Sequence, residues 1–207
     1  MRFTFFFALP LFAACSSSPD TRQATSTTSA ATDTNTAAEP MDTARATKVN
    51  AQSDTLKVVR RKHLFSSPSS PDQFMLTLRG TNLLSAEASF TITDASGQVI
   101  FREVLTAPDL EASMVYEMQG SSATQAEREA FVKKRMEEFF ADKNFQKPAL
   151  AKSERYQPGQ LDRATWDDLQ RRPDATSFRY LVGKEETRRI AWSPLKKQVV
   201  KLGSTGG

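Results

Sequence analysis

The alternation of hydrophobic and polar residues in the middle of the chain predicts β-strands. Apolar side chains occupy every second position over 73–79 and again over 86–93, which is the period of a half-buried strand. Residues 94–97 are Asp, Ala, Ser and Gly, so we expect a turn there and a β-hairpin that returns over 99–105. The run before them, 56–65, is predicted to form another strand.

The pattern changes to a helical period after Thr124. Thr124 and Glu127 have the spacing of a capping box, and apolar residues then recur three or four positions apart as far as Phe140. This pattern predicts a helix of about 18 residues with one apolar side facing the core. A shorter helix is predicted over 160–173, with Pro173 at its end.

The last third of the chain returns to alternation. Strands are predicted over 178–182, 190–192 and 198–202, with a polar turn at 183–186, and together they form a three-stranded meander. Strands, then helices, then strands again are typical of an α+β fold. We therefore expect an antiparallel sheet of hairpins and a C-terminal meander, packed against one longer and one shorter helix.

The first fourteen residues form a different kind of segment. Arg2 precedes an apolar run of roughly ten residues, which suits a signal peptide, because a transmembrane helix needs about 20 residues. Leu11 to Ala14, followed by Cys15, resemble the lipobox of bacterial lipoproteins, with Phe12 where that motif usually has Leu. The resemblance implies cleavage before Cys15 and acylation of its thiol. The alternative is an ordinary secretory signal that leaves Cys15 as a free thiol.

Composition predicts a tether between this anchor and the folded part. Residues 15–55 are rich in Ser, Thr and Ala and contain no aromatic residue. They lack the apolar surface needed to offset about 1–2 kcal/mol of backbone entropy per ordered residue, so we expect disorder. A coil of about 40 residues reaches roughly 35 Å. The sequence thus predicts a signal peptide over 1–14, the lipidated cysteine and tether over 15–55, and one globular domain over 56–207.

Residues suited to catalysis are scarce. The chain has one cysteine and one histidine, so acylation of Cys15 would leave the mature domain without a thiol for a disulfide, a nucleophile or zinc. His63 follows Arg61 and Lys62 and has no nucleophile-elbow motif to accompany it, so we do not expect a catalytic triad. Nucleotide-binding glycine loops and calcium loops are also absent from the sequence. We expect no cofactor and no metal.

A glycosidase would need only two carboxylates. Asp167 and Asp168 are adjacent on the shorter predicted helix and point to different faces, and Asp168 suits the N3 position behind a Thr165 cap. Glu185 and Glu186 fall in the predicted turn, where solvated charges are common. These positions favour a non-enzymatic module. An envelope hydrolase that acts on carbohydrate through paired carboxylates is the alternative.

Charge adds one candidate site. Residues 56–207 contain 24 Lys and Arg and 19 Asp and Glu, and the basic residues gather near the end of the chain. Basic side chains near an anionic surface contribute about 1 kcal/mol each, which favours binding to phosphate-bearing lipid or polysaccharide. The alternative is a solvated sheet face that resists edge-to-edge aggregation. The candidate residues for anionic-surface binding are Lys184, Arg188, Arg189, Lys196, Lys197 and Lys201.

These observations predict a membrane-anchored envelope lipoprotein with a non-enzymatic binding or structural module. Its expected partners are the membrane, through the lipid anchor, and an envelope polysaccharide, an anionic lipid or a protein. Nucleic acid is not expected, because an exported, lipid-anchored protein seldom meets it. Ser16, which follows the cysteine where inner-membrane lipoproteins of diderm bacteria carry aspartate, favours the outer membrane by the same resemblance.

Overall fold

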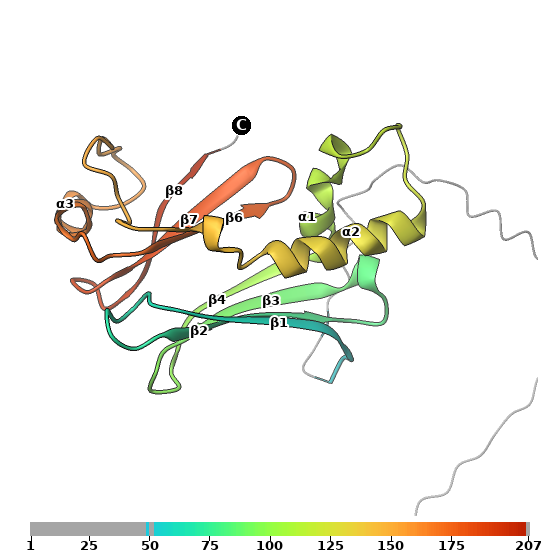
Figure 1. Cartoon of the computed structure of the whole chain (residues 1–207), viewed down its shortest axis with the longest axis horizontal. Coiled ribbons are helices and arrows are strands. Elements are labelled where there is room, and N and C mark those ends of the chain that lie inside the picture. Colours follow the sequence, from blue (N-terminus) through green and yellow to red (C-terminus); the bar gives the residue numbers. More distant parts are fainter. Residues whose placement is uncertain (1–48, 50–51, 206–207) are drawn as a thin grey trace, which may run out of the picture. The chain divides into compact units, whose positions relative to one another are not determined.

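The computed structural model describes residue 49 and residues 52–205. All of them belong to the second of the two units into which the chain divides, Asn35–Gly207. The predicted signal peptide at 1–14, and all of the predicted tether except Val49 and residues 52–55, lie outside the described residues. The described part has the predicted α+β fold, with two antiparallel four-stranded sheets and three α-helices (Figure 1).

The first sheet confirms the four strands predicted in the first half of the domain. Its order is the order of the sequence, so each strand pairs with the next: β1 (Thr55–His63), β2 (Asp72–Arg79), β3 (Glu87–Thr93) and β4 (Val99–Thr106). Asp94 organises the β3–β4 turn, because its carboxylate accepts the amides of Ser96 and Gln98, both at 2.9 Å. Gly97 adopts a φ of 90° there, a conformation that favours glycine.

The capping box predicted at Thr124 is confirmed. Thr124 Oγ1 accepts the Glu127 amide at 3.3 Å, and Glu127 Oε2 accepts the Thr124 amide at 2.8 Å. The helix that follows, α2 (Gln125–Glu138), has 14 residues, fewer than predicted, because the chain turns before the short 3-10 helix η3 (Asp142–Asn144). Phe139 and Phe140 are nevertheless buried, as their spacing predicted.

A short helix that the sequence analysis did not predict precedes α2. It is α1 (Ala107–Glu111), which continues as the 3-10 helix η2 (Ala112–Tyr116). Thr106 and Asp109 form a second capping box around it. The link between the two sheets is therefore largely helical.

The second sheet contains the predicted meander and one additional strand. Its order is β5 (Phe145–Gln146), β6 (Ser177–Val182), β7 (Glu186–Ser193) and β8 (Gln198–Thr205). The hairpins and the meander thus lie in two sheets rather than in one.

The shorter predicted helix is α3 (Arg163–Arg171), and its cap differs from the expectation. Asp162, not Thr165, caps it, and the Asp162 carboxylate accepts the Thr165 amide at 3.0 Å. Asp168 is not an N3 partner, because its carboxylate pairs with Arg172 at 2.9 Å.

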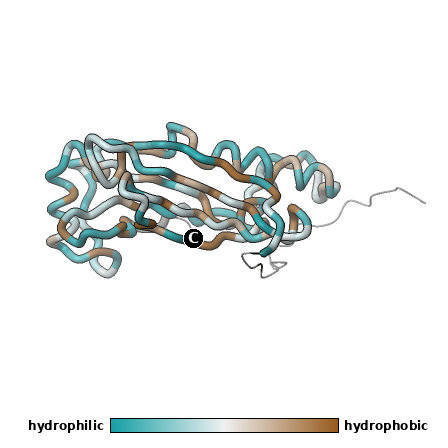
Figure 2. The backbone as a smooth tube through the Cα atoms, turned by 90° about the horizontal axis from the view of Figure 1, so that it is seen from below, coloured by the Kyte–Doolittle hydropathy of each residue, from teal (hydrophilic) through white to brown (hydrophobic). Residues whose placement is uncertain are grey.

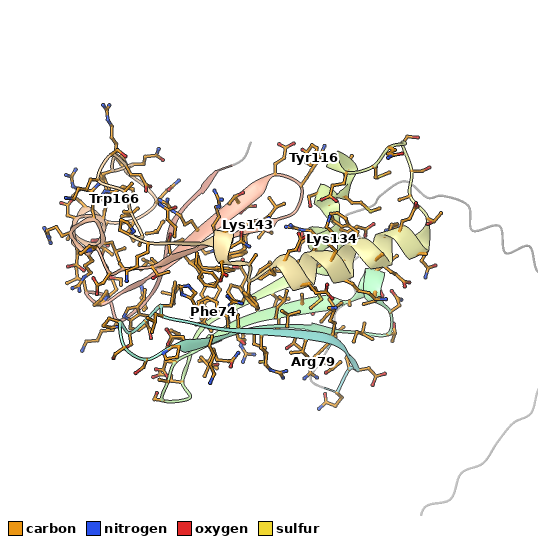
Figure 3. All side chains as sticks on the ribbon, in the orientation of Figure 1. Phe74, Arg79, Tyr116, Lys134, Lys143 and Trp166 are labelled. Carbon is orange, nitrogen blue, oxygen red and sulfur yellow. The ribbon has the colours of Figure 1, made fainter. Side chains whose placement is uncertain are left out.

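The main core lies between the two sheets and α2. Phe74 in β2 packs against Phe178 in β6 with ring centroids 5.4 Å apart, and Phe90 in β3 lies 5.5 Å from Phe178. Both contacts are edge-to-face, a favoured aromatic geometry. Figure 3 shows Phe74 between the sheets. Hydrophobic and hydrophilic stretches alternate along the trace in Figure 2, consistent with sheets that bury one side of each strand.

A second, smaller core lies on the other face of the second sheet. Trp166 and Leu169 of α3 pack there against Ala191 of β7 and Val200 of β8. Leu150, from the loop that precedes α3, joins them. The second sheet is therefore covered on both faces at the α3 end, and this covering forms one wall of the pocket described next.

Candidate functional site

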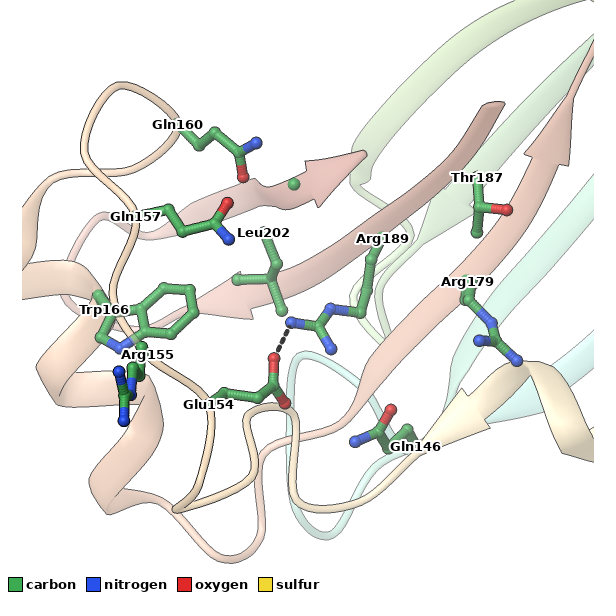
Figure 4. A pocket seen from close by; sticks show the side chains of 11 residues that line it. Gln146, Glu154, Arg155, Gln157, Gln160, Trp166, Arg179, Thr187, Arg189 and Leu202 are labelled. Atoms are coloured by element: carbon green, nitrogen blue, oxygen red, sulfur yellow. Dashed lines mark hydrogen bonds and ion pairs between the residues drawn. The ribbon is translucent and has the colours of Figure 1, made fainter. Parts of the chain in front are cut away.

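A polar pocket of about 280 Å³ lies on the α3 face of the second sheet (Figure 4). All four strands of this sheet, the loop before α3 and α3 itself contribute to its lining. Besides Trp166, Thr187 and Leu202, the lining contains Gly203, the carboxylate Glu154, three arginines and three glutamines. The arginines and glutamines are Arg155, Arg179, Arg189, Gln146, Gln157 and Gln160.

The strand register brings two of these arginines together. Arg179 in β6 is directly opposite Arg189 in β7, so the two side chains share one face. Arg189 forms an ion pair with Glu154 at 2.5 Å, and Figure 4 shows Arg179 apart from that pair. The side chains of Arg155 and Arg179 form no hydrogen bond or ion pair with any other described residue, so their guanidinium donors are available to a ligand.

Glu154 is ionised and forms the counter-ion of Arg189. Burial by itself would raise the pKa of Glu154. Hydrogen bonds from Arg189 and the Ala151 amide, together with the Arg189 charge, outweigh burial and hold that pKa below its usual value. A catalytic acid needs a raised pKa. Among the residues that line this pocket, all within the described part of the chain, Glu154 is the one carboxylate, so no pair of the glycosidase type forms there.

A second pocket, of about 240 Å³, adjoins the first near the end of α2. The two pockets share Arg179 and Thr187, and the second adds Arg135, Lys143 and Glu138. The edge of β6 is open at this place because β5 pairs only with the first two residues of β6. We call the combined lining of the two pockets the arginine groove. It contains five basic side chains and two carboxylates.

The six residues predicted for anionic-surface binding do not share one face. Successive strand residues point to opposite faces, so Arg188 and Arg189 diverge. Arg189 lines the arginine groove, whereas Arg188 pairs with Glu103 and Glu186. Lys196 lies in the β7–β8 turn, 3.1 Å from Asp162.

The other predicted basic residues are spread over both ends of the meander. Lys184 lies in the β6–β7 turn with its ammonium 5.6 Å from the ring centroid of Tyr116. Lys197 is exposed in the β7–β8 turn with a φ of 53°, and Lys201, exposed on β8, lines a separate pocket together with Arg188. The binding role of the six stays a prediction, since only Arg189 belongs to the groove.

The carboxylates considered for catalysis are each paired with a different group. Asp167 lies 2.9 Å from Arg163, and Glu186 lies 2.6 Å from Arg188. Glu185 accepts a hydrogen bond from the Tyr116 hydroxyl. Arg188 also pairs with Glu103, so the Glu103 and Glu186 carboxylates share one guanidinium, which holds both as ion-pair partners.

His63 has a packing role. Its ring stacks on Phe145 with centroids 3.9 Å apart and an angle of 4° between the planes, and Nδ1 lies 2.9 Å from the Leu64 carbonyl oxygen. Since Phe145 belongs to β5, this contact joins the end of β1 to the edge of the second sheet.

A half-buried polar cluster lies where β4 meets the second sheet. Tyr180 donates its hydroxyl to Glu103, and Arg188 pairs with the other oxygen of the same carboxylate. Burial, and then the negative charge of Glu186, raise the pKa of the Tyr180 phenol. Both oxygens of the Glu103 carboxylate are engaged within the cluster, so we infer that the cluster stabilises the contact between β4 and the second sheet.

Most residues of the arginine groove were not predicted from the sequence. Arg179 follows the core-facing Phe178 in β6, and because successive strand residues point to opposite faces, this alternation indicated that Arg179 lies on the outer face. Arg155, Gln157 and Gln160 lie in a loop without periodicity, so no pattern indicated that this loop packs beside the sheet.

Comparisons with known proteins add no identity. Searches with the chain against protein-family models, curated proteins and solved structures found no match. Among residues 52–205, no group of three or more His, Cys, Asp or Glu side chains is arranged to hold a metal ion. Over the same described stretch, no helix combines the length and apolarity required to cross a membrane.

Proposed function

We propose that this protein is a lipoprotein of the bacterial cell envelope whose α+β module binds an envelope component without transforming it. An acylated Cys15 anchors it to a membrane, with the outer membrane favoured over the inner. The observation that carries the proposal is the lipobox-like segment Leu11 to Cys15 behind a short apolar run.

The anchor and the tether suit a binding module. Two or three acyl chains hold a protein stably at about 0.8 kcal/mol per buried CH₂ group, so the domain needs no membrane-spanning segment of its own. A tether of about 40 residues lets the domain search roughly 35 Å from the bilayer. Within that reach lie the headgroups and the saccharide polymers of an envelope.

The arginine groove supports binding over catalysis. Its exposed cations, Arg155 and Arg179, are positioned to recognise an anion, and its most buried carboxylate, Glu154, is neutralised by Arg189. An arrangement with free cations and a paired carboxylate holds a charged ligand but supplies neither a general acid nor a nucleophile.

Acylation of Cys15 tests the proposal directly. We would express wild type, Cys15→Ala and the matched neighbour control Ser16→Ala in a diderm bacterial host, measure intact masses and separate the two membranes. Wild type and Ser16→Ala should carry the added mass of the acyl chains and sediment with membranes, whereas Cys15→Ala should have neither property. An unacylated wild-type chain recovered as a soluble protein would refute the proposal.

A further inference from the structure

We infer that the arginine groove binds an anionic glycan, meaning an extended saccharide chain that carries carboxylate groups. The inference rests on the proposed function and deepens it, because it names the ligand class of the binding module. It depends on three features of the groove: uncompensated charge, unengaged amides and an elongated shape.

The charge of the groove selects an anion. Of its five basic side chains, Arg189 is neutralised by Glu154, and Arg135 lies 4.0 Å from Glu138. The remaining three, Arg155, Arg179 and Lys143, have no ion-pair partner among the described residues. Guanidinium groups hold carboxylates through two parallel hydrogen bonds, so two free arginines in one groove favour a ligand with more than one such group.

The amides of the groove suit a saccharide. Gln146, Gln157 and Gln160 are exposed, and their side chains form no hydrogen bond with another described residue. A primary amide both donates and accepts, which matches the hydroxyl groups of a sugar. Trp166 adds an apolar wall beside them, and a ring with a polar edge is a common contact for ligands that are partly apolar.

Gly203 allows one of these amides to approach the sheet. A Cβ atom at this position in β8 would collide with Oε1 of Gln160, and the φ of 134° also favours glycine. The loop that carries Gln160 therefore packs against β8 with its amide turned toward the pocket, as Figure 4 shows. This close packing places an amide at the end of the groove opposite Arg179.

The shape of the groove favours a chain over a flat surface. Two pockets of about 280 and 240 Å³ meet at Arg179 and Thr187, so a ligand that fills both extends along the sheet from α3 to the end of α2. A bilayer presents its phosphates in a plane. The cations here line a recess, and a phosphate, which only accepts, would use the donors of the three glutamine amides and leave their carbonyl oxygens unused, whereas sugar hydroxyls use both.

Binding to a defined oligomer tests the inference. The probe is hexagalacturonic acid, and the protein is the full acylated chain in detergent micelles, measured by isothermal titration calorimetry. Wild type should bind it, and the methyl ester of the same oligomer, which keeps the sugars but removes the charge, should bind at least tenfold more weakly. A tenfold loss corresponds to about 1.4 kcal/mol, close to the lower end of the range of about 1.5–3 kcal/mol for one hydrogen bond to a charged group.

Variants locate the binding. Arg179→Ala should weaken hexagalacturonate binding by about tenfold to a hundredfold, and Arg179→Lys should recover only part of it, because a lysine keeps the charge but loses the paired donors. Arg60→Ala removes the same charge from the first sheet, outside the groove, and should change affinity less than twofold. Arg179 is exposed, so its variants should keep the circular dichroism spectrum of wild type.

Three outcomes would overturn the inference. The first is no binding by wild type, and the second is binding that Arg179→Ala leaves unchanged. The third is equal or tighter binding of polyphosphate or glycerol phosphate, which would indicate a general anion or lipid-headgroup site. Failure here with an acylated Cys15 would leave the envelope lipoprotein proposal intact. Glycan binding by a chain whose Cys15 is not acylated would support the ligand assigned to the groove and refute the lipid anchor.

Discussion

The buried ion pair between α1 and α2 yields a sharp stability prediction. Glu111 is 1 % exposed and Arg128 is 5 % exposed. The Glu111 carboxylate accepts both Nε and a terminal nitrogen of Arg128, the second at 3.2 Å. Glu111→Gln keeps the size of the side chain but removes the carboxylate charge that the buried guanidinium contacts. Removing one partner from such a pair costs about 3–5 kcal/mol.

The expected shift is large enough to measure readily. For a domain of this size each 1 kcal/mol lowers the melting temperature by about 2–4 °C, so Glu111→Gln should melt roughly 6–20 °C below wild type. The assay is urea and thermal unfolding followed by tryptophan fluorescence and far-ultraviolet circular dichroism. Replacement of both partners, Glu111→Leu with Arg128→Met, should restore most of the loss, because an apolar pair needs no desolvated charge.

The structure supplies a matched control six residues farther along both helical segments. Glu117 and Lys134 form an ion pair at 2.8 Å across the same interface, but their side chains are 54 % and 50 % exposed. Figure 3 shows Lys134 on α2. Because water screens this pair, Glu117→Gln should unfold at the wild-type urea midpoint. Equal midpoints for Glu111→Gln, Glu117→Gln and wild type would refute the reasoning from burial.

Three further predictions follow from the core, the α3 cap and the buried phenol. Phe90→Ala should lose about 3–5 kcal/mol of unfolding free energy in urea titrations, because it leaves a cavity in the centre of the aromatic core. Val104 is exposed, so Val104→Ala should lose little, and similar losses for the two variants would contradict the prediction. The Thr165 amide and hydroxyl, followed by Lys196, lower the pKa of Asp162 to about 2, so the stability it contributes should be lost as pH falls from about 4 toward 2. Asp162→Asn should remove that part of the acid dependence, and an NMR midpoint for the Asp162 carboxylate near 4 would refute it. Burial raises the pKa of Tyr180, so unfolding free energy should fall above pH 10, and Tyr180→Phe should flatten that decline in alkaline urea titrations.

Features set by neighbouring residues were predictable from the sequence. The alternation in β2 and β3 fixed which side chains face the core, and the Thr124 capping box marked the first residue of α2. Both depend on hydrogen bonds and burial patterns within a few residues. The capping box at Thr106 was present too, but a helix of five residues, Ala107–Glu111, leaves too short a pattern to recognise.

Features set by distant contacts were not predictable. Alternation says which face of a strand is buried but not which strands share a sheet, so the division into two sheets escaped the sequence. The groove escaped for the same reason. Its loop is placed by Ala149 and Leu150, which are buried under α3, and two apolar residues in an irregular segment give no period.

Phe74 and Phe178, which pack together in the core, are synthesised at different times. The first sheet pairs only neighbouring strands, so it can form once β4 has emerged, and its apolar face then has no cover from the second sheet. Phe178 follows the end of β4 by 72 residues, a delay of about 4–14 s at translation rates of about 5–20 residues per second. During that interval Phe74 and Phe90, which are buried in the finished protein, lack their contact with Phe178. A nascent chain stalled before β6 would therefore expose an apolar sheet face, prone to aggregation, that is buried in the finished protein.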